Sequence, residues 1–325
     1  MSKLQSVCEQ SSSQANIQIG ISSCLLGQQV RFDGGHKQSM YCKKEIAAHF
    51  EYVPVCPEMA IGMGAPRKSI RQIRDGETIY IRSADGSVDV TDDLNRFSEQ
   101  KVAELSDLDG YILCAKSPTC GMERVTQYKI GTNNGTKSGV GVFAQKLMQT
   151  YPHLPVEEEG RLHDLVLREN FFTRVFAHND WQNMMRSGVS KHKLIQFHSR
   201  YKYMLMAHSP AWYRDLGPIL ANIEDVEQTA AQYFAGFMTA LKIRATRKNH
   251  TSTLQHLQGY FKKKLTGQQK QELSSMIMKY REGLVPLLVP ITLINHYLTQ
   301  FPTEYIENQV YLNPHPEEMK LRYAY

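Results

Sequence analysis

Three cysteines stand where loops are expected to follow buried strands. Cys24 comes after the apolar run 17–21, Cys56 comes after 52–55, and Cys120 lies in the loop after 111–115. That loop contains a proline, which has no N–H for a central strand, and a glycine, which lets the backbone turn. In a parallel α/β sheet, the loops beyond the carboxyl ends of the strands converge on one crevice. Three thiols delivered there could share one metal centre.

The alternative reading of these thiols is simple burial, because a buried cysteine is often only a small apolar side chain. We expect this for Cys42, beside a predicted helix, and for Cys114, inside a predicted strand. The sequence has no Cys-x-x-Cys pair, which argues against a zinc ribbon or a thioredoxin motif. For the three loop cysteines, the pattern by itself leaves metal binding and simple burial open.

The elements that must position these cysteines alternate between strand and helix. Such alternation predicts an α/β fold with a doubly wound, Rossmann-like parallel sheet. A small hairpin, formed by 78–82 and 88–90, is expected at an edge, and a glycine-rich loop is expected after residue 121. The predicted strands are 17–21, 52–55, 111–115 and 154–157, and the predicted helices are 43–50, 91–105, 140–151 and 163–184.

Beyond residue 187 the pattern becomes helical throughout. The segment 192–207 is aromatic and basic, and an amphipathic pattern predicts a helix over 228–247. Thr251 or Ser252 could cap a second helix, and Thr266 could cap a third that runs to residue 283. We therefore predict three parts. They are a disordered lead over 1–16 that contains Cys8, an α/β domain over 17–187, and an all-α domain over 188–325.

The charge of the chain is uneven. The 325 residues carry a formal net charge of +6, with 42% hydrophobic and 22% charged residues, as in ordinary globular proteins. Residues 1–184 hold 20 Lys+Arg against 22 Asp+Glu, whereas residues 185–325 hold 18 against 10. A basic second half indicates a polyanionic partner.

The chain resembles the thiouracil desulfidase family (DUF523-type domain) in three motifs that occur in the family's order. They are Ser-Ser-Cys-Leu-Leu-Gly at 22–27 with Val-Arg-Phe-Asp-Gly-Gly at 30–35, Val-Cys-Pro-Glu at 55–58, and Lys-Ser-Pro-Thr-Cys-Gly at 116–121. This resemblance runs from about residue 17 to 175. The segments 254–260 and 285–290 are similar to a DUF1722-type helical domain, as in the longer bacterial RNA 4-thiouridine desulfidases.

The resemblance implies a redox-neutral enzyme that removes sulfur from 4-thiouridine in tRNA to give uridine. It implies that Cys24, Cys56 and Cys120 hold a [4Fe–4S] cluster with one iron free of protein ligands. It also implies that Glu58 and Ser117 are catalytic. In the absence of this resemblance, we would interpret Glu58 as a solvated loop carboxylate and Ser117 as a turn-forming hydroxyl. An anionic nucleotide needs donors, so the basic residues of the same loops, Arg31, Lys37 and Arg67, are candidates for substrate contact.

A basic set in the second half is the candidate tRNA-binding surface. No acidic residue occurs between Glu227 and Glu272. The alternative is a solvated basic face over an aromatic core, and we expect Tyr233 and Phe237 to be core residues. The candidate phosphate contacts are Arg200, Lys202, Arg244, Arg247, Lys248, Lys262, Lys263 and Lys264.

Two other functions remain open from the sequence. One is a desulfidase of free thiouracil or thionucleosides. The other is a non-catalytic RNA-binding protein with a closed structural metal site, which would need a fourth ligand such as His36, Cys42 or Cys114. No apolar run approaches the ~20 residues of a membrane span and the first residues lack a secretory pattern, so a cytoplasmic location is expected.

Overall fold

The computed structural model describes residues 17–323, so the predicted lead over 1–16, with Cys8, lies outside the described part. The chain divides into one compact unit that ends at His163 and a second that begins at Asp164. The predicted boundary at 187 falls later, after helix α4 (Leu165–Arg186). That helix belongs with the second unit because its Trp181 ring stacks on Phe234 at 4.9 Å and meets Phe197 edge-on.

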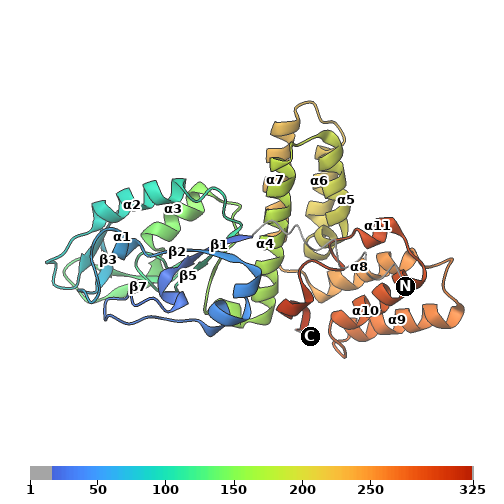
Figure 1. Ribbon diagram of the computed structural model, residues 1–325, viewed down its shortest axis with the longest axis horizontal. Helices are drawn as coiled ribbons and strands as arrows, with labels where there is room; N and C mark the ends of the chain where they lie inside the picture. Colours follow the sequence, from blue (N-terminus) through green and yellow to red (C-terminus); the bar gives the residue numbers. More distant parts are fainter. Residues whose placement is uncertain (1–16, 324–325) are drawn as a thin grey trace. The chain divides into compact units, whose positions relative to one another are not determined.

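A four-stranded parallel sheet forms the centre of the first unit (Figure 1). Its strands are β1 (Gln18–Ser22), β2 (Glu51–Val55), β5 (Gly110–Leu113) and β8 (Val156–Glu158), in the spatial order β2-β1-β5-β8. The strand that follows β1 lies on one side of it and the later strands lie on the other, so the order reverses at β1. The predicted fold class, an α/β domain with a parallel sheet followed by a helical domain, is confirmed.

Burial explains why the central strands read as continuous apolar runs. Ile19 and Ile21 of β1 and Ile112 and Leu113 of β5 are fully buried, as expected for strands covered on both faces. Gly20 lies between the two isoleucines, and a Cβ there would come within 2.2 Å of the Tyr111 ring. Glycine at this position therefore lets β1 and β5 pair beside a buried tyrosine.

Two helices cover this sheet, and one predicted helix is absent. Helices α2 (Thr91–Ala103) and α3 (Val142–Thr150) pack on each other (Figure 1) and bury Leu94 and Leu147. The helix predicted over 43–50 is instead a π turn, η3 (Tyr41–Glu45), followed by a 3-10 turn, η4 (Ala47–His49). Its few apolar positions were too short a pattern to separate an α-helix from irregular turns.

A second four-stranded sheet, in the order β4-β3-β6-β7, corrects two expectations. The hairpin pairs β3 (Ile70–Asp75) with β4 (Thr78–Ser83), and the predicted arm 88–90 contributes only a bridge between Arg82 and Asp89. The expected glycine-rich loop contains β6 (Val125–Lys129) and β7 (Gly135–Gly139). Polar side chains on these strands hid the two-residue alternation that normally reveals a half-buried strand.

The second unit is helical throughout its described residues. Thr266 caps α9 with a reciprocal capping box, as predicted, but Thr246 rather than Thr251 caps α8. The helix expected over 228–247 ends at Lys242. After α4 come α5 (Lys191–His208), α6 (Pro210–Ile219), α7 (Val226–Lys242), α8 (Arg247–Gly259), α9 (Gly267–Arg281), α10 (Leu288–Gln300) and α11 (Glu304–Glu307).

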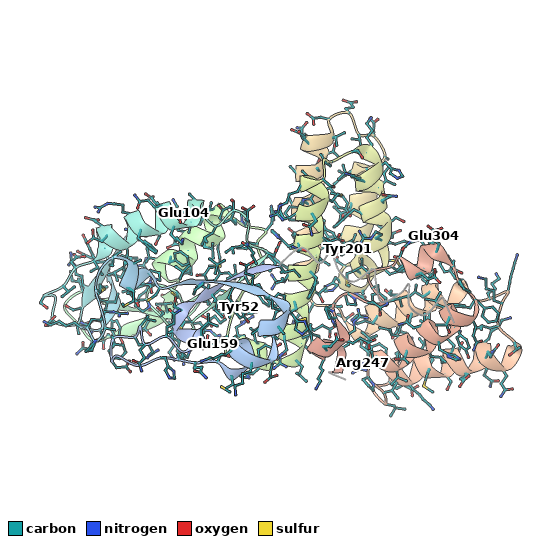
Figure 2. The ribbon with its side chains drawn as sticks, viewed as in Figure 1. Tyr52, Glu104, Glu159, Tyr201, Arg247 and Glu304 are labelled. Carbon is teal, nitrogen blue, oxygen red and sulfur yellow. The ribbon has the colours of Figure 1, made fainter. Side chains whose placement is uncertain are left out.

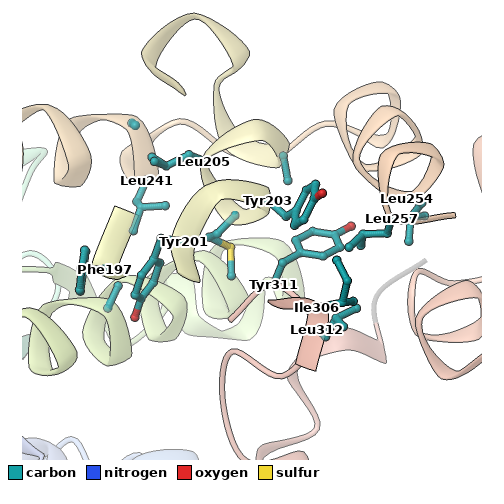
Figure 3. Packing of buried hydrophobic residues seen from close by; sticks show 14 of the residues in the cluster. Phe197, Tyr201, Tyr203, Leu205, Leu241, Leu254, Leu257, Ile306, Tyr311 and Leu312 are labelled. Atoms are coloured by element: carbon teal, nitrogen blue, oxygen red, sulfur yellow. The ribbon is translucent and has the colours of Figure 1, made fainter. Parts of the chain in front are cut away.

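Aromatic rings fill the core of this helical unit (Figure 3). Phe197 stacks on Tyr201 at 4.4 Å, and Tyr233 lies parallel to Phe237 at 6.0 Å. These rings are buried, so they support the fold rather than a surface for stacking bases, as the sequence led us to expect for Tyr233 and Phe237. Among residues 17–323, no helix is both long and apolar enough to cross a membrane.

Buried neutral histidines are a second feature of the helical core. Burial lowers the pKa of His208 from 6.5 to about 4, and its Nδ1 donates to the carbonyl oxygen of Ile243 at 2.6 Å. Burial also lowers the pKa of His250 and brings that of His315 to about 3. The folded unit therefore takes up fewer protons than the unfolded chain in mild acid.

We expect the helical unit to lose stability as the pH falls from about 7 to 5. The unfolded chain binds a proton at His208 below about 6.5 and the folded chain only below about 4, so acid favours unfolding in this window. For His208 alone the loss is about 2 kcal/mol at pH 5. Thermal unfolding followed by far-UV circular dichroism measures it, and His208→Gln should flatten the dependence. A melting temperature that stays constant over this range would contradict the expectation.

Candidate active site

The carboxyl ends of β1, β2 and β5 open into one cavity of about 430 Å³. Cys24, Cys56 and Cys120 all line it, as the parallel arrangement predicts. Because β1 lies between β2 and β5, the three cysteines come from three adjacent strand ends. The structure thus brings together sulfurs that are far apart in the sequence.

Short turns hold Cys24 and Cys56 at their strand ends. Cys24 lies in a 3-10 turn, η2 (Ser23–Leu26), which Gly27 ends with a left-handed φ of 91°. Its carbonyl oxygen accepts from the N–H groups of Gly27 and Lys37, which fixes the following loop. Cys56 directly follows β2 and precedes α1 (Pro57–Ala60), a single turn that begins with Pro57, a residue favoured at the first helical position.

The loop 116–121 that carries Cys120 is anchored on the start of α3. The N–H groups of Val142 and Phe143 donate to the carbonyl oxygens of Pro118 and Thr119. Gln72, buried in β3, donates to Pro118 as well, at 3.0 Å. The loop opens at Lys116 with a left-handed φ of 65°, a conformation that an L-residue keeps only where its surroundings impose it. Cys120 is therefore held in a rigid loop and is almost fully buried.

A fourth thiol borders the same cavity. Cys114, which we expected to be an ordinary buried cysteine, follows β5 and is hydrogen-bonded to Cys24. This hydrogen bond lowers the pKa of Cys114 and, together with burial, raises that of Cys24. Its place in the same strand–loop segment as Cys120 was the sequence signal that could have revealed it. Of the other suggested fourth ligands, neither His36 nor Cys42 lines the cavity.

The donor set is one that an iron–sulfur cluster takes, because soft thiolates surround a single cavity. Burial raises the pKa of Cys56 and of Cys120, so buried thiolates there need a cation beside them. Within residues 17–323, no three His, Cys, Asp or Glu side chains are grouped so as to hold a single metal ion. A cluster binds each thiolate through a different iron and so accepts sulfurs that stand farther apart.

Glu58 and Ser117 are connected through Thr119, a residue that the sequence analysis did not single out. Thr119 Oγ1 donates to Glu58 Oε1 at 2.7 Å and lies 2.9 Å from Ser117 Oγ. The single hydroxyl proton of Thr119 goes to the carboxylate, so the Ser117 hydroxyl is the donor in the second bond. A hydrogen-bonded path therefore leads from Ser117 through Thr119 to Glu58.

Arg67 holds the other oxygen of Glu58. Its Nη2 lies 2.6 Å from Glu58 Oε2, and the two side chains are only 6% and 15% exposed. Arg67 Nη1 also donates to the carbonyl oxygen of Gly64 at 2.7 Å. The carboxylate is thus clamped between Arg67 and Thr119, and its orientation on the cavity wall is fixed.

The other two basic candidates, Arg31 and Lys37, also line the cavity. Arg31 Nε lies 3.7 Å from Asp33 Oδ1, and Lys37 forms an ion pair with Glu159. Glu159 follows β8 (Figure 2) and accepts from the Ala115 N–H at 2.9 Å, so the fourth strand end also supports the site. Glu159 was missed because it is one of three consecutive glutamates, all of them buried, and the sequence gave no sign of which one pairs with Lys37.

The candidate RNA-binding residues fall into two groups in the structure. Lys248, Lys262, Lys263 and Arg200 are exposed, although Arg200 pairs with Asp180 at 3.1 Å. Lys264 is exposed and donates to Thr303 Oγ1 at 2.9 Å, and Lys202 lies over the Tyr203 ring. Arg244 and Arg247 instead line a small cavity of the helical unit.

Comparisons with known proteins match both halves of the chain. A model of the 2-thiouracil desulfurase family matches residues 19–159, and a model described as a protein of unknown function (DUF1722) matches residues 202–316. The uncharacterized protein YbgA of Escherichia coli (strain K12) is 33% identical over 154 residues, covering 46% of this chain and 91% of that protein. A solved structure of the [4Fe-4S]-dependent thiouracil desulfidase TudS is 28% identical with a TM-score of 0.39, covering 47% of this chain and 97% of that one.

We expect Gly141→Ala to destabilise the first unit by about 1–3 kcal/mol, the usual cost of overpacking. A Cβ at Gly141 would lie 2.5 Å from the Thr119 carbonyl oxygen and would push the loop 116–121 off α3. Gly160→Ala is the matched control, since nothing lies within 4 Å of its added Cβ. Urea unfolding followed by labelling of the buried thiols measures both variants, and equal midpoints would show that the loop tolerates the extra methyl group.

Proposed function

Because this chain belongs to the family in which a 2-thiouracil desulfurase domain is followed by a DUF1722 domain, we propose that it removes sulfur from 4-thiouridine in tRNA and leaves uridine. The family supports the coarser statement of an enzyme that acts on thiouracil, a thiolated pyrimidine. The observation that carries the proposal is the grouping of Cys24, Cys56 and Cys120 with Glu58 and Ser117 on one cavity. Its volume of about 430 Å³ lies within the ~300–1,000 Å³ of small-molecule pockets.

Three thiolates, from Cys24, Cys56 and Cys120, would hold a [4Fe–4S] cluster with one iron free of protein ligands. When bound, the cluster supplies a soft, electron-accepting metal for the thiocarbonyl sulfur, which makes the attached carbon electrophilic. The overall change is a hydrolysis, in which water supplies the new carbonyl oxygen and the sulfur leaves as sulfide. No external oxidant or reductant is required.

Glu58 would accept the proton of the attacking water. Arg67 and Thr119 each hold one of its oxygens, and each carboxylate oxygen can accept a further hydrogen bond from that water. Once Glu58 is protonated, the hydroxyls of Thr119 and Ser117 can rotate so that Glu58 donates to Thr119 and Thr119 donates to Ser117. Ser117 can then pass its own hydroxyl proton to the base or the departing sulfur, while the proton from Glu58 replaces it. Proton transfer by a positioned side chain contributes about 10²- to 10⁴-fold to a rate.

The cations around the cavity would receive the nucleotide. Arg31 and Lys37 line it, and each keeps N–H donors beyond those used by Asp33 and Glu159. Arg67 is committed to Glu58, so we assign it the orientation of the carboxylate first and substrate contact second. The exposed lysines of the helical unit would contact the phosphates of the tRNA.

The decisive experiment incubates oxygen-free, cluster-reconstituted protein with tRNA that contains 4-thiouridine. We expect the absorbance of 4-thiouridine to disappear and sulfide to accumulate in equal amount. Loss of sulfur from free 4-thiouracil but not from tRNA would favour the alternative substrate, a free thiobase. No loss from either would end the proposed activity.

The cysteine variants should fall into two groups, those that lose iron and those that keep it. We expect about four irons and labile sulfide per chain in the native protein, and loss of most of this iron in Cys24→Ser, Cys56→Ser and Cys120→Ser. Cys42→Ser, buried but away from the cavity, is the matched control. Cys114→Ser should keep its iron, because the proposal leaves the fourth iron without a thiolate. Iron loss in that variant would favour the closed, structural metal site.

Glu58→Gln and Thr119→Val should keep the cluster and lose turnover. Glutamine cannot accept the proton, and valine breaks the path to Ser117 while keeping the shape of threonine. We expect a loss of about 10²-fold or more for Glu58→Gln and a smaller loss for Thr119→Val, with Thr119→Ser near the native rate. Initial rates at matched iron content measure these effects, and a native rate in Glu58→Gln would remove this residue from the mechanism.

Binding of tRNA should weaken steeply with salt. Each phosphate contact contributes about 0.9 to the slope of log K against log salt on a duplex. Lys262→Gln combined with Lys263→Gln should therefore lower the slope and the affinity, whereas Lys279→Gln on the exposed side of α9 should change neither. Filter binding between 50 and 200 mM salt measures the slopes, and a flat salt response in the native protein would contradict RNA binding by this surface.

A further inference from the structure

The helical unit contains a second, smaller polar cavity. It has a volume of about 140 Å³ and lies among α4, α5, the start of α8, the end of α9 and the 3-10 turn η7 (Leu321–Tyr323). This volume is less than half of the ~300 Å³ at which small-molecule pockets usually begin. The cavity therefore suits one compact chemical group rather than a whole nucleoside.

Positive charge dominates the wall of this cavity. Arg244, Arg247 and Arg322 line it, and Glu169 is the only acidic residue among the described residues that do. Arginine stays charged at any relevant pH. Glu169 can neutralise one of the three arginines, which leaves two positive charges on the wall. Arg322 is buried and faces that carboxylate, whereas Arg247 is half-buried and Arg244 is exposed. An anion that enters the cavity would therefore meet more positive than negative charge, which favours an anionic occupant.

Arg322 is the deepest of the three cations. It is 5% exposed, its Nε makes no hydrogen bond within the described residues, and the Glu169 carboxylate lies 3.5 Å away from that atom. Its guanidinium lies over the Tyr311 ring at 5.2 Å. Its Nη1 donates to the Leu312 carbonyl oxygen at 3.4 Å. A guanidinium that rests on an aromatic face presents its remaining N–H groups along its edge, which is how arginine recognises planar arrays of oxygens.

Arg247 repeats this arrangement at the first turn of α8 (Figure 2). Its guanidinium lies over the Tyr280 ring at 5.0 Å, and its Nη1 donates to the Tyr280 carbonyl oxygen at 2.7 Å. The positive end of the α8 dipole adds to the field at this point. Arg244, which is exposed, lies on the same wall and leaves the cavity open to solvent on its side.

We propose that this cavity binds one phosphate monoester group through Arg247 and Arg322. A phosphate is compact enough for the volume of the cavity. It also presents oxygens on several sides, so it can accept hydrogen bonds from both guanidinium groups, each of which lies over its own tyrosine ring. A terminal monoester can enter such a small space from its open side, whereas a diester within a strand would have to continue on both sides. The source is either a free phosphate or nucleotide, or the 5′-phosphate of an RNA chain. The proposal stands independently of the desulfurisation reaction.

The test uses the full-length protein and inorganic phosphate as the first probe. We expect saturable one-to-one binding in calorimetry and a rise in melting temperature. Arg322→Gln and Arg247→Gln should each weaken binding by about 10-fold or more, the size of a lost charged hydrogen bond. Arg281→Gln, an exposed arginine of α9 away from the cavity, is the matched control. If Arg322→Gln fails to fold, the half-exposed Arg247 supplies the test by itself.

Glu169→Gln gives the sharper result, because its expected effect has the opposite sign. Removing this carboxylate, the only one on the wall among residues 17–323, should tighten phosphate binding several-fold, which no general damage to the fold would produce. No saturable phosphate binding in the native protein would overturn the proposal. Weaker or unchanged binding in Glu169→Gln, or an equal loss in Arg281→Gln, would overturn it too.

The source of the phosphate is decided by a pair of RNA oligonucleotides that differ only at the 5′ end. Tighter binding of the 5′-phosphorylated RNA than of its 5′-hydroxyl twin, abolished by Arg247→Gln, would assign the cavity to the end of an RNA chain. Equal binding of the two RNAs, together with saturable binding of phosphate and adenosine 5′-monophosphate, would assign it to a free phosphate ester.

Discussion

Parallel pairing of β2, β1, β5 and β8 is the constraint on which the site depends. Parallel strands end at the same edge, so the residues that follow them meet there however far apart they are in sequence. The register pairs Ser22 with Val55 and Ile21 with Ile112, which brings the residues after each strand to one level. A slip of one residue in β1 would turn its side chains to the opposite face and carry Cys24 away from the other thiols.

The sequence was sufficient for this arrangement because fully buried strands have a strong local signature. The apolar runs ending near Ser22, Val55 and Leu113 predicted both the strands and the loops that hold the three cysteines. The residues that complete the site carry no such signature. Thr119 reads as one more loop residue, and its importance depends on a contact with Glu58, which is 61 positions away. Cys114 reads as part of the strand, and its proximity to Cys24 arises only from the β1–β5 pairing.

The second sheet could not be predicted in full from local sequence patterns. Strand β3 carries Arg71, Gln72 and Arg74, and β7 is mostly glycine and polar residues, so neither has the alternation that burial imposes. Gln72 is nevertheless almost fully buried, because its amide donates to two carbonyl oxygens, one in the loop 116–121 and the other at Val140. A buried amide that fastens a functional loop is a long-range property. In the sequence, Gln72 is only a polar residue among other polar residues, and nothing nearby indicates that it is buried.

The basic residues of the helical unit illustrate how position changes the role of one residue type. Lys262 and Lys263 are exposed, and a lysine side chain is a point charge on a long aliphatic stem. They therefore suit a nucleic-acid backbone, which requires charge but little geometry. Arg247 and Arg322 lie on the rings of Tyr280 and Tyr311, where their orientation is fixed before any ligand arrives. Fixed donors lose little entropy on binding and discriminate by shape. Net charge, which is all that the sequence displays, cannot separate these two modes, because only the aromatic partner beneath each guanidinium distinguishes a recognition site from a charged surface.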